Sequence, residues 1–366
     1  MKINICSNGN PTNPATWSGT PCHLCSELQQ KNMLGKAFDS NRTGFTLKIL
    51  KLAAKCYYPG AEDVTRSFFF RYANARKVIA ETATGKSNHT LHTGTSDLPF
   101  KRFPKTQKHY LYCDSTWNLY CLFSNIENDS KRLLRDAENL EREAYRQMEH
   151  IFTISEYVKD NLISHYGINS NKITVVGTGL GVLKPYYGKK DYSNKKILFA
   201  AKGNFENKGG TFVLQALEMA LKKMPDLQLT IVGQNQYIQQ IKHPNITVLG
   251  FIPIEELQAI FNECSLFLMP AFYEPWGLVY LEALACRMPI VGLNRNSFPE
   301  LSGYGKYGFA LNNPDPIAMA DILIEAFAQP ELLERMGKSG QEYCLNTFSW
   351  SNTIDRIITV IKANFE

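Results

Sequence analysis

The second half of the chain alternates between short, continuously apolar runs and longer segments whose apolar residues recur at helical spacing. The apolar runs predict strands at 172–177, 195–202, 227–233, 245–252, 265–272 and 288–293. The segments between them predict helices at 210–224, 254–264 and 277–286. Strands that are apolar throughout are buried on both faces, which is typical of a parallel sheet covered by helices. We therefore expect a doubly wound α/β domain, in which ligands bind at the carboxyl ends of the strands.

The first half of the chain has a less regular pattern. It predicts strands at 2–8 and 109–116, a long helix with a polar face within 127–150, and a strand followed by a helix within 151–167. A chain of 366 residues exceeds the roughly 250–300 residues at which a single core stops growing, so two domains are expected. Residues 184–194, "KPYYGKKDYSN", are rich in Tyr, Lys and Gly and predict a linker, which places the boundary near residue 184.

Composition indicates an ordinary globular protein. No apolar stretch approaches the roughly 18–20 residues needed to cross a bilayer, and the first residues, "MKINICSNGN", lack the apolar core of a signal peptide. Nine cysteines are an odd number and are scattered along the chain, which favours reduced thiols in a cytoplasmic compartment over a disulfide framework.

The net charge of +6 is unevenly distributed. Residues 1–182 carry 23 Lys and Arg against 16 Asp and Glu, a net charge of +7, whereas the remaining residues carry 17 against 18, a net charge of −1. A basic half is suited to nucleic acid, to an anionic membrane surface or to a phosphorylated substrate. A solvated face with a modest bias explains the same charge equally well.

Two glutamates flank the start of the helix predicted after residues 265–272. Pro275 suits the first helical position, so Glu274 lies on the loop and Glu282 lies inside the helix. Their separation of roughly 12 Å along the helix axis exceeds the 5–9.5 Å of a glycoside hydrolase pair. The backbone amides near Gly277 and Leu278 form an anion site between them. A ligand that fits this arrangement would have hydroxyl groups at both ends, for the two glutamates, and phosphate groups between them, for the amides. A nucleotide sugar has its groups in this order.

A plainer interpretation makes Glu274 a helix cap and Glu282 a solvated side chain. Glu282, however, lies between Leu281 and Ala283 in an apolar helix, where an unpaired charge is costly. We therefore favour a role in ligand binding for both glutamates.

Residues 274–292, "EPWGLVYLEALACRMPIVG", resemble the E-x7-E signature of the retaining glycosyltransferases of the GT-B fold, in particular family 4. Residues 199–217, 248–257 and 348–361 resemble further segments of that family. The resemblance extends over about 150–366 and is loose before that. It implies an α/β fold of two Rossmann-like doubly wound domains that face each other across a cleft. The expected parts are an acceptor domain at 1–184, a nucleotide-sugar domain at 185–345 and a terminal helix at 346–366 that returns to the first domain.

The resemblance also implies roles for individual side chains in the nucleotide-sugar domain. Glu274 would bind hydroxyls of the transferred sugar, Glu282 the ribose hydroxyls, and Lys208 together with Lys202 the diphosphate. The remaining donor contacts would come from the segment that flanks the base and from the start of the helix: Phe251, Ile252, Trp276, Gly277, Leu278 and Val279.

The sequence departs from the family pattern at two places. Lys202 precedes Lys208 by six residues, where the family more often has five and carries a Gly-Arg pair. Arg287 and Met288 stand where the family has a small residue, which leaves the sugar specificity open.

The predicted reaction needs groups that hold the negative charge that develops on the leaving phosphate. The sequence has no Asp-x-Asp motif, and lysines with a helix N-terminus can stabilise this charge, one such donor contributing roughly 2.7–4 kcal/mol. We therefore expect a metal-independent reaction without a cofactor. Retention of the anomeric configuration is implied by the resemblance alone.

The acceptor side of the site is predicted from two residues of the first half. Gly19, in "TWSGTP", resembles the family's glycine loop, where the backbone approaches the donor; a turn before a helix explains the same residues. Asp114, in "YLYCDSTW", ends a predicted strand and would orient the acceptor hydroxyl, or it caps the next helix. The acceptor would be a saccharide, a lipid-linked molecule or another hydroxyl compound.

Three motifs resemble sites that their surroundings exclude. "GTGLGV" at 177–182 ends in valine and precedes no helix, so it fails as a dinucleotide fingerprint and fits a loop between domains. "AETATGKS" at 80–87 lacks the first glycine of a phosphate loop. "CHLC" at 22–25 has no second cysteine pair at zinc spacing, so no metal site is expected.

The sequence is also compatible with other functions. A nucleotide-sugar epimerase, a phosphorylase or another enzyme that is not a transferase could share the fold. A nucleic-acid-binding protein would need basic and aromatic residues interleaved on one face, and residues 67–77 fit a half-buried helix better. Residues 44–58, "GFTLKILKLAAKCYY", fit either an ordinary surface helix or an element that rests on an anionic membrane. We expect a cytoplasmic protein, possible peripheral contact with such a membrane, and no nucleic acid.

Overall fold

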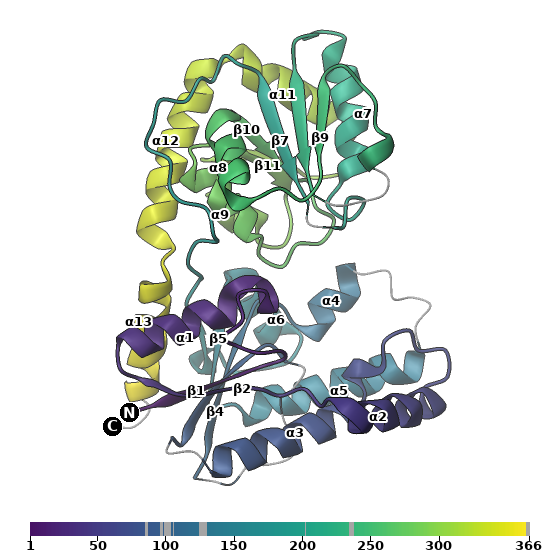
Figure 1. Ribbon diagram of the computed structural model, residues 1–366, viewed down its shortest axis with the longest axis vertical. Helices are drawn as coiled ribbons and strands as arrows, with labels where there is room; N and C mark the ends of the chain where they lie inside the picture. Colours follow the sequence, from purple (N-terminus) through teal and green to yellow (C-terminus); the bar gives the residue numbers. More distant parts are fainter. Residues whose placement is uncertain are drawn as a thin grey trace. The chain divides into compact units, whose positions relative to one another are not determined.

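The computed structural model describes residues 1–84, 87–95, 98, 104, 106–123, 130–201, 203–233 and 238–363. The chain divides into two units: unit 1 comprises Met1–Gly179 and Trp350–Glu366, and unit 2 comprises Leu180–Ser349. Each unit contains one sheet with helices around it (Figure 1). The division falls within residues 177–182, and the tyrosine- and lysine-rich stretch at 184–194 belongs to unit 2.

Unit 1 is built on a six-stranded parallel sheet with the order β2-β1-β3-β4-β5-β6. Its strands are β1 Ile3–Ser7, β2 Leu34–Asp39, β3 His89–Thr93, β4 Lys108–Cys113, β5 His150–Thr153 and β6 Ile173–Val175. β1 and β5 are buried at every position, whereas β2 at the edge is buried only at Phe38. The strand order reverses between β1 and β3, and such reversal points are where ligands bind in open α/β sheets.

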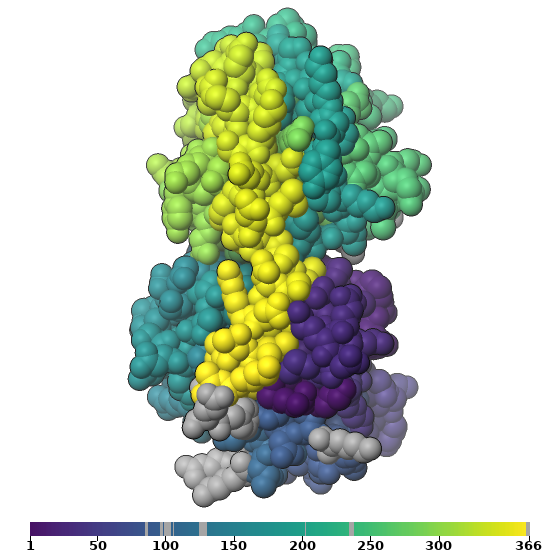
Figure 2. Space-filling model, turned by 90° about the vertical axis from the view of Figure 1, so that its left-hand side faces the viewer, coloured from purple at the N-terminus to yellow at the C-terminus, as the bar shows by residue number. Residues whose placement is uncertain are grey.

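The helices of unit 1 are α1 Thr20–Gln30, α2 Gly44–Tyr57, α3 Phe68–Ala83, α4 Trp117–Phe123, α5 Lys131–Gln147, α6 Glu156–Ser164 and α13 Trp350–Ala363, with short 3-10 turns η1 Thr16–Gly19, η2 Val64–Arg66 and η3 Ser170–Lys172. α13 packs against α1. Lys31 forms an ion pair with Asp355 at 2.9 Å, and the His23 ring stacks on Trp350. Figure 2 shows this C-terminal helix, in yellow, beside the purple N-terminal segment. The last helix thereby completes a unit whose other elements end some 170 residues earlier.

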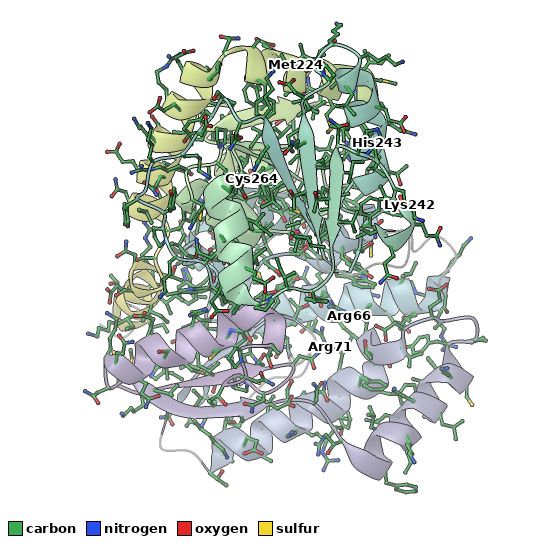
Figure 3. The ribbon with its side chains drawn as sticks, turned by 45° about the horizontal axis from the view of Figure 1, so that its top comes forward. Arg66, Arg71, Met224, Lys242, His243 and Cys264 are labelled. Atoms are coloured by element: carbon green, nitrogen blue, oxygen red, sulfur yellow. The ribbon has the colours of Figure 1, made fainter. Side chains whose placement is uncertain are left out.

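A buried ion pair ties α3 to α5 in unit 1. Arg71 on α3 donates to Glu141 Oε1 on α5 at 2.9 Å, and both side chains are almost fully buried. Arg66 reaches the same oxygen at 3.4 Å from a partly exposed position, and Figure 3 shows the two arginines close together. A buried charge of this kind needs its partner, because removal of one side leaves the other unpaired in a medium of low polarity.

Unit 2 is built on a second six-stranded parallel sheet, with the order β12-β11-β10-β7-β8-β9. Its strands are β7 Lys196–Ala200, β8 Gln228–Val232, β9 Ile246–Leu249, β10 Leu266–Leu268, β11 Ile290–Leu293 and β12 Gly308–Leu311. The chain runs outward from β7 to β9 and then returns to β10 on the other side of β7. The reversal point of this sheet therefore lies between β7 and β10.

The helices of unit 2 are α7 Gly210–Leu221, α8 Ile254–Glu263, α9 Leu278–Ala285, α10 Phe298–Leu301, α11 Pro316–Ala328 and α12 Pro330–Thr347, with a 3-10 turn η4 Ile238–Gln240. α7 packs against α11, and α9 against α12. The core combines the apolar faces of β7, β8 and β10 with buried side chains of α7 and α11. No helix within the described ranges has both the length and the apolarity required to traverse a bilayer.

Hydrogen bonds and the buried side chains of Lys190 and Tyr192 hold the stretch at 184–194 against the rest of unit 2. Tyr186 donates its backbone N–H to the Ala285 carbonyl, and the Tyr192 hydroxyl donates to the Arg287 carbonyl. Lys190 is buried and its ammonium donates to the carbonyls of Phe261, Asn262 and Cys264 at 2.8, 2.9 and 2.6 Å. A lysine there satisfies carbonyls that the end of α8 leaves without an intrahelical partner.

Candidate active site

Two loops meet at the reversal point of the sheet in unit 2. The first connects β7 to α7 and contains Lys208, and the second connects β10 to α9 and contains Glu274. β7 and β10 are adjacent parallel strands, so both loops leave the same edge of the sheet. Sequence reasoning assigned the two residues to separate strand-to-helix loops, and the strand order is what brings these loops together.

Backbone contacts hold the two loops against each other. The Phe272 N–H donates to the Asn207 carbonyl at 2.9 Å. Gly209 has a φ of +84°, and a Cβ atom at this position would lie 2.5 Å from the Pro270 carbonyl oxygen. Only glycine adopts this conformation readily and leaves room for the second loop. The glycine after Lys208 therefore allows the close approach that positions the lysine.

Lys208 and Glu274 form an ion pair at this junction, through Lys208 Nζ and Glu274 Oε2. Both side chains are about one-fifth exposed, so the pair is partly buried and still accessible. A carboxylate can accept hydrogen bonds from hydroxyl groups, and an ammonium can stabilise a phosphate oxygen. The pair therefore places a hydrogen-bond acceptor and a positive charge side by side at the edge of the unit 2 sheet where a ligand is expected to bind.

Both helices that follow these loops begin without a side-chain cap. Gly209 precedes α7 and Gly277 precedes α9, and neither helix start is capped by a side chain. The first amide groups of a helix carry a partial positive charge and attract anions. Two such helix starts and Lys208 at one edge of the sheet make this region suited to a negatively charged ligand.

The start of α9 differs from the sequence prediction. The helix begins at Leu278 rather than at Pro275, because Gly277 has a left-handed φ of +85° and breaks the helical backbone. Trp276 is buried and its carbonyl accepts a hydrogen bond from Ser297 Oγ at 2.6 Å. Leu278 and Val279 are partly exposed. Glu282 therefore lies in the second turn of α9.

Glu282 holds the first residues of unit 2 in place. Its Oε1 accepts the backbone N–H groups of Val182 at 2.7 Å and of Leu183 at 3.3 Å. The side chain is buried, and burial raises the pKa of Glu282 while the two N–H bonds oppose this shift. Its Oε2 accepts no hydrogen bond from any residue that the structure describes. Sequence reasoning did not foresee this anchor, because the partners are 100 residues apart.

The remaining donor-side residues are spread along the same sheet edge. Phe251 and Ile252 lie on the turn between β9 and α8, where the Phe251 side chain is 62% exposed. β8 separates β9 from β7, so this turn is farther from Lys208 than Glu274 is. Lys202 lies outside the described residues.

Gly19 and Asp114 belong to unit 1, where Gly19 ends the connection from β1 to α1 and Asp114 directly follows β4. Gly19 has a φ of +85° and directly precedes α1, and Trp17 and Ser18 before it also have left-handed backbones. The Trp17 indole Nε1 donates to Asp114 Oδ2 at 3.1 Å. Sequence reasoning missed Trp17, since nothing in its local sequence signals a partner 97 residues away.

Two family models match the chain in succession. The model described as "Glycosyltransferase Family 4" matches residues 89–181, and the model described as "Glycosyl transferases group 1" matches residues 188–343. The second match contains both Lys208 and Glu274. The chain belongs to glycosyltransferase family 4. The retaining mechanism and the roles of the two glutamates stay predictions.

Curated relatives of this family 4 chain are distant in sequence. The spore coat protein SA of Bacillus subtilis is 22% identical over 58% of this chain and 65% of its own length. The putative glycosyltransferase YtcC of the same organism is 23% identical over 79% of this chain and 76% of its own length. This chain thus spans about two thirds of the first relative and three quarters of the second.

Solved structures identify the fold as GT-B, with two Rossmann-like domains. Sucrose-phosphate synthase from Thermosynechococcus elongatus matches with a TM-score of 0.74 and 14% identity, over 100% of this chain and 99% of that one. HepE from Anabaena, solved in complex with UDP and glucose, matches with a TM-score of 0.65 and 15% identity, over 99% and 100% of the two chains. This confirms the fold class that was predicted for the family 4 chain.

Proposed function

We propose that this family 4 chain transfers a hexose-type sugar from a nucleotide diphosphate sugar to an acceptor hydroxyl, with retention of the anomeric configuration and without a divalent metal. The observation that carries this proposal is the Lys208–Glu274 pair at the reversal point of the unit 2 sheet, next to the starts of α7 and α9. A sugar hydroxyl needs an acceptor and a diphosphate needs positive charge, and this junction supplies both.

Each group at the junction has a distinct task in the proposed reaction. As the bond between sugar and phosphate breaks, negative charge develops on the leaving diphosphate. Lys208 and the amide groups that begin α9 at Leu278 stabilise that charge in the transition state. Glu274 accepts hydroxyl groups of the transferred sugar and thereby orients its anomeric carbon. Lys202 is a second phosphate ligand in this proposal, on the strength of the family resemblance alone.

The other end of the donor lies along the same edge of the sheet. Glu282 uses Oε1 to anchor the backbone of residues 182–183, and its Oε2 accepts the ribose hydroxyls. The base rests against the turn that carries Phe251 and Ile252, where an exposed aromatic ring is available for stacking. Because HepE was solved with UDP and glucose, a uridine diphosphate sugar is the first donor to test.

The acceptor side of the proposal rests on Gly19 and Asp114 in unit 1. The Trp17 indole fixes one oxygen of the Asp114 carboxylate, which then orients the acceptor hydroxyl for attack on the anomeric carbon. Gly19 allows the backbone to approach the donor because it lacks a Cβ atom. A cytoplasmic location completes the proposal.

Donor binding provides the test. A ligand at 100 times its dissociation constant stabilises a protein by about 2.7 kcal/mol, which raises the melting temperature of a unit of about 170 residues by roughly 5–10 °C. We would screen uridine- and guanosine-diphosphate sugars by this shift and compare wild type with Lys208→Met. Lys222→Met is the matched control, because Lys222 is exposed at the opposite end of α7.

The proposal expects the shift to vanish in Lys208→Met and to survive in Lys222→Met. An unchanged shift in Lys208→Met would contradict it. Acceptor dependence separates transfer from the alternatives: conversion of the donor without any acceptor indicates an epimerase or another enzyme that is not a transferase. A product whose anomeric configuration is inverted in NMR spectra would contradict the retaining mechanism, but it would not contradict donor binding.

A further inference from the structure

Helix α2 of unit 1 has two opposite apolar faces. Leu47, Leu50 and Ala54 face inward and pack into a small cluster with residues of η2, α3 and α5. On the opposite side, Phe45, Ile49 and Leu52 are 77%, 52% and 68% exposed. At 100° per residue these three side chains lie within about 60° of one another on one stripe. A helix that only covers a core has polar residues on this side, so core packing does not explain the stripe.

A row of lysines runs along one flank of this stripe. Lys48, Lys51 and Lys55 are exposed and share one side of the helix, and α2 contains no Asp or Glu. None of the three forms an ion pair with any residue in the described ranges. The outer surface of α2 therefore combines a contiguous apolar ridge with three uncompensated positive charges.

Neighbouring helices extend this surface with aromatic and basic groups. Phe68 and Tyr72 on α3 are partly exposed and stack on each other at 5.8 Å. The Arg132 guanidinium of α5 lies 3.6 Å from the centre of the Tyr57 ring. A hollow of about 490 Å³ is lined by Tyr57, Tyr58, Phe68 and Phe69 and also by Asp136 and Glu143 of α5, so the basic surface is that of α2 itself. Figure 1 shows α2 on the outside of unit 1, beside α3 and α5.

We propose that the outer face of α2 binds the surface of an anionic lipid membrane. In this arrangement Phe45, Ile49 and Leu52 enter the boundary between headgroups and acyl chains, and the lysine row contacts headgroup phosphates. An amphipathic helix that lies in the membrane interface has this combination of apolar and basic residues. The proposal stands independently of the sugar-transfer reaction, because it concerns a different face of the fold and needs no donor.

The lysine row and the apolar ridge of α2 together favour an anionic membrane over a second copy of the chain or a nucleic acid. A symmetric dimer through this face would bury the same patch of both copies, which brings two sets of three lysines into one interface. Close like charges oppose such a contact. A nucleic acid would contact the lysines and leave the apolar ridge in water. An anionic bilayer accommodates both features together.

Vesicle flotation tests the proposal with the full-length chain. Wild type is expected to float with vesicles of phosphatidylcholine and phosphatidylglycerol, to stay behind with phosphatidylcholine alone, and to dissociate as salt screens the charges. Lys48→Gln/Lys51→Gln/Lys55→Gln should weaken binding by roughly fivefold for each lysine, about a hundredfold in total. Phe45→Ser/Ile49→Ser/Leu52→Ser should abolish flotation at every lipid composition.

Matched controls come from exposed residues of unit 2. Ile317→Ser removes a side chain that is 62% exposed, and Lys222→Gln/Lys223→Gln removes exposed charges; both variants should float like wild type. Thermal unfolding of all variants should stay near that of wild type, because the substituted side chains face solvent.

Two results would overturn the proposal. One is flotation that is indifferent to anionic lipid or unchanged in the ridge variant. The other is light scattering that shows a dimer in wild type and a monomer in the ridge variant, since a second copy would then cover α2.

Discussion

Replacing Gly181 by alanine tests how Glu282 is held inside unit 2. A Cβ atom at position 181 would overlap the Glu282 carboxylate, with Glu282 Cδ only 2.7 Å away. Gly181 has no left-handed backbone, so alanine introduces no strain other than this overlap. The Glu282 side chain must therefore move and release the N–H groups of Val182 and Leu183.

The expected decrease in the free energy of unfolding follows from the loss of these two hydrogen bonds. A hydrogen bond to a charged group contributes about 1.5–3 kcal/mol. Val182 is largely exposed, so its released N–H can bond to water, whereas Leu183 is buried and its N–H loses its partner outright. If the Leu183 hydrogen bond is counted fully and the Val182 hydrogen bond in part, the free energy of unfolding decreases by about 3 kcal/mol. For a unit of about 170 residues this lowers the melting temperature by roughly 6–12 °C.

Calorimetry on three variants measures the effect. Gly250→Ala is the matched control, because a Cβ atom there meets nothing within 4 Å; it should leave stability unchanged or raise it by about 0.4–1 kcal/mol. Gly181→Ala made in a Glu282→Ala background should cost little, because the carboxylate that it displaces is gone. Equal losses for Gly181→Ala in both backgrounds would refute the reasoning.

Three further predictions concern unit 2, protonation and metals. Lys190→Met should lower the free energy of unfolding by about 3 kcal/mol, since three carbonyls lose their donor, whereas exposed Lys189→Met should be neutral in the same melts. Burial lowers the pKa of His150 to about 4 and that of His109 well below 6.5, so the native state takes up fewer protons than the unfolded state below pH 6.5. The free energy of unfolding should therefore decrease as the pH falls from 6.5 toward 4. This decrease should be less steep in His150→Gln than in wild type, and equal slopes for the two proteins would contradict the prediction. Sugar transfer should persist in EDTA, and its loss with recovery on adding Mg²⁺ or Mn²⁺ would disprove metal independence.

The sequence alone predicts the strands whose residues form a distinct local pattern of apolar positions. Every strand predicted in the second half is present, because continuously apolar runs of that length are stable only inside a covered sheet. β2, β3 and β12 were not predicted. β2 lies at the sheet edge and is buried only at Phe38, so its residues lack the apolar pattern of the central strands. β12, Gly308–Leu311, lies at the edge of the other sheet, where only its first and last residues are buried.

The details of the candidate site depended on packing that no local pattern encodes. Pro275 suits a first helical position, yet Gly277 starts α9 two residues later, because its left-handed backbone is packed against Tyr280 and Glu274. The partners of Glu282 and of Asp114 are 100 and 97 residues away along the chain. Lys208 and Glu274 are 66 residues apart, but both follow strands of one parallel sheet, so topology alone places them at one edge.

Glu282 combines an anchoring role with a proposed binding role, and two variants separate them. Glu282→Gln keeps an oxygen that can accept the N–H groups of Val182 and Leu183, while it removes the negative charge that would bind ribose hydroxyls strongly. Gly181→Ala keeps the charge and disturbs the anchor. If Oε2 binds the ribose, Glu282→Gln should melt near the wild-type temperature and lose most of the donor-induced shift. Gly181→Ala should lower both the melting temperature and the shift, because the displaced carboxylate no longer points at the ligand. A Glu282→Gln variant that retains the full donor shift would assign this glutamate to the anchor alone.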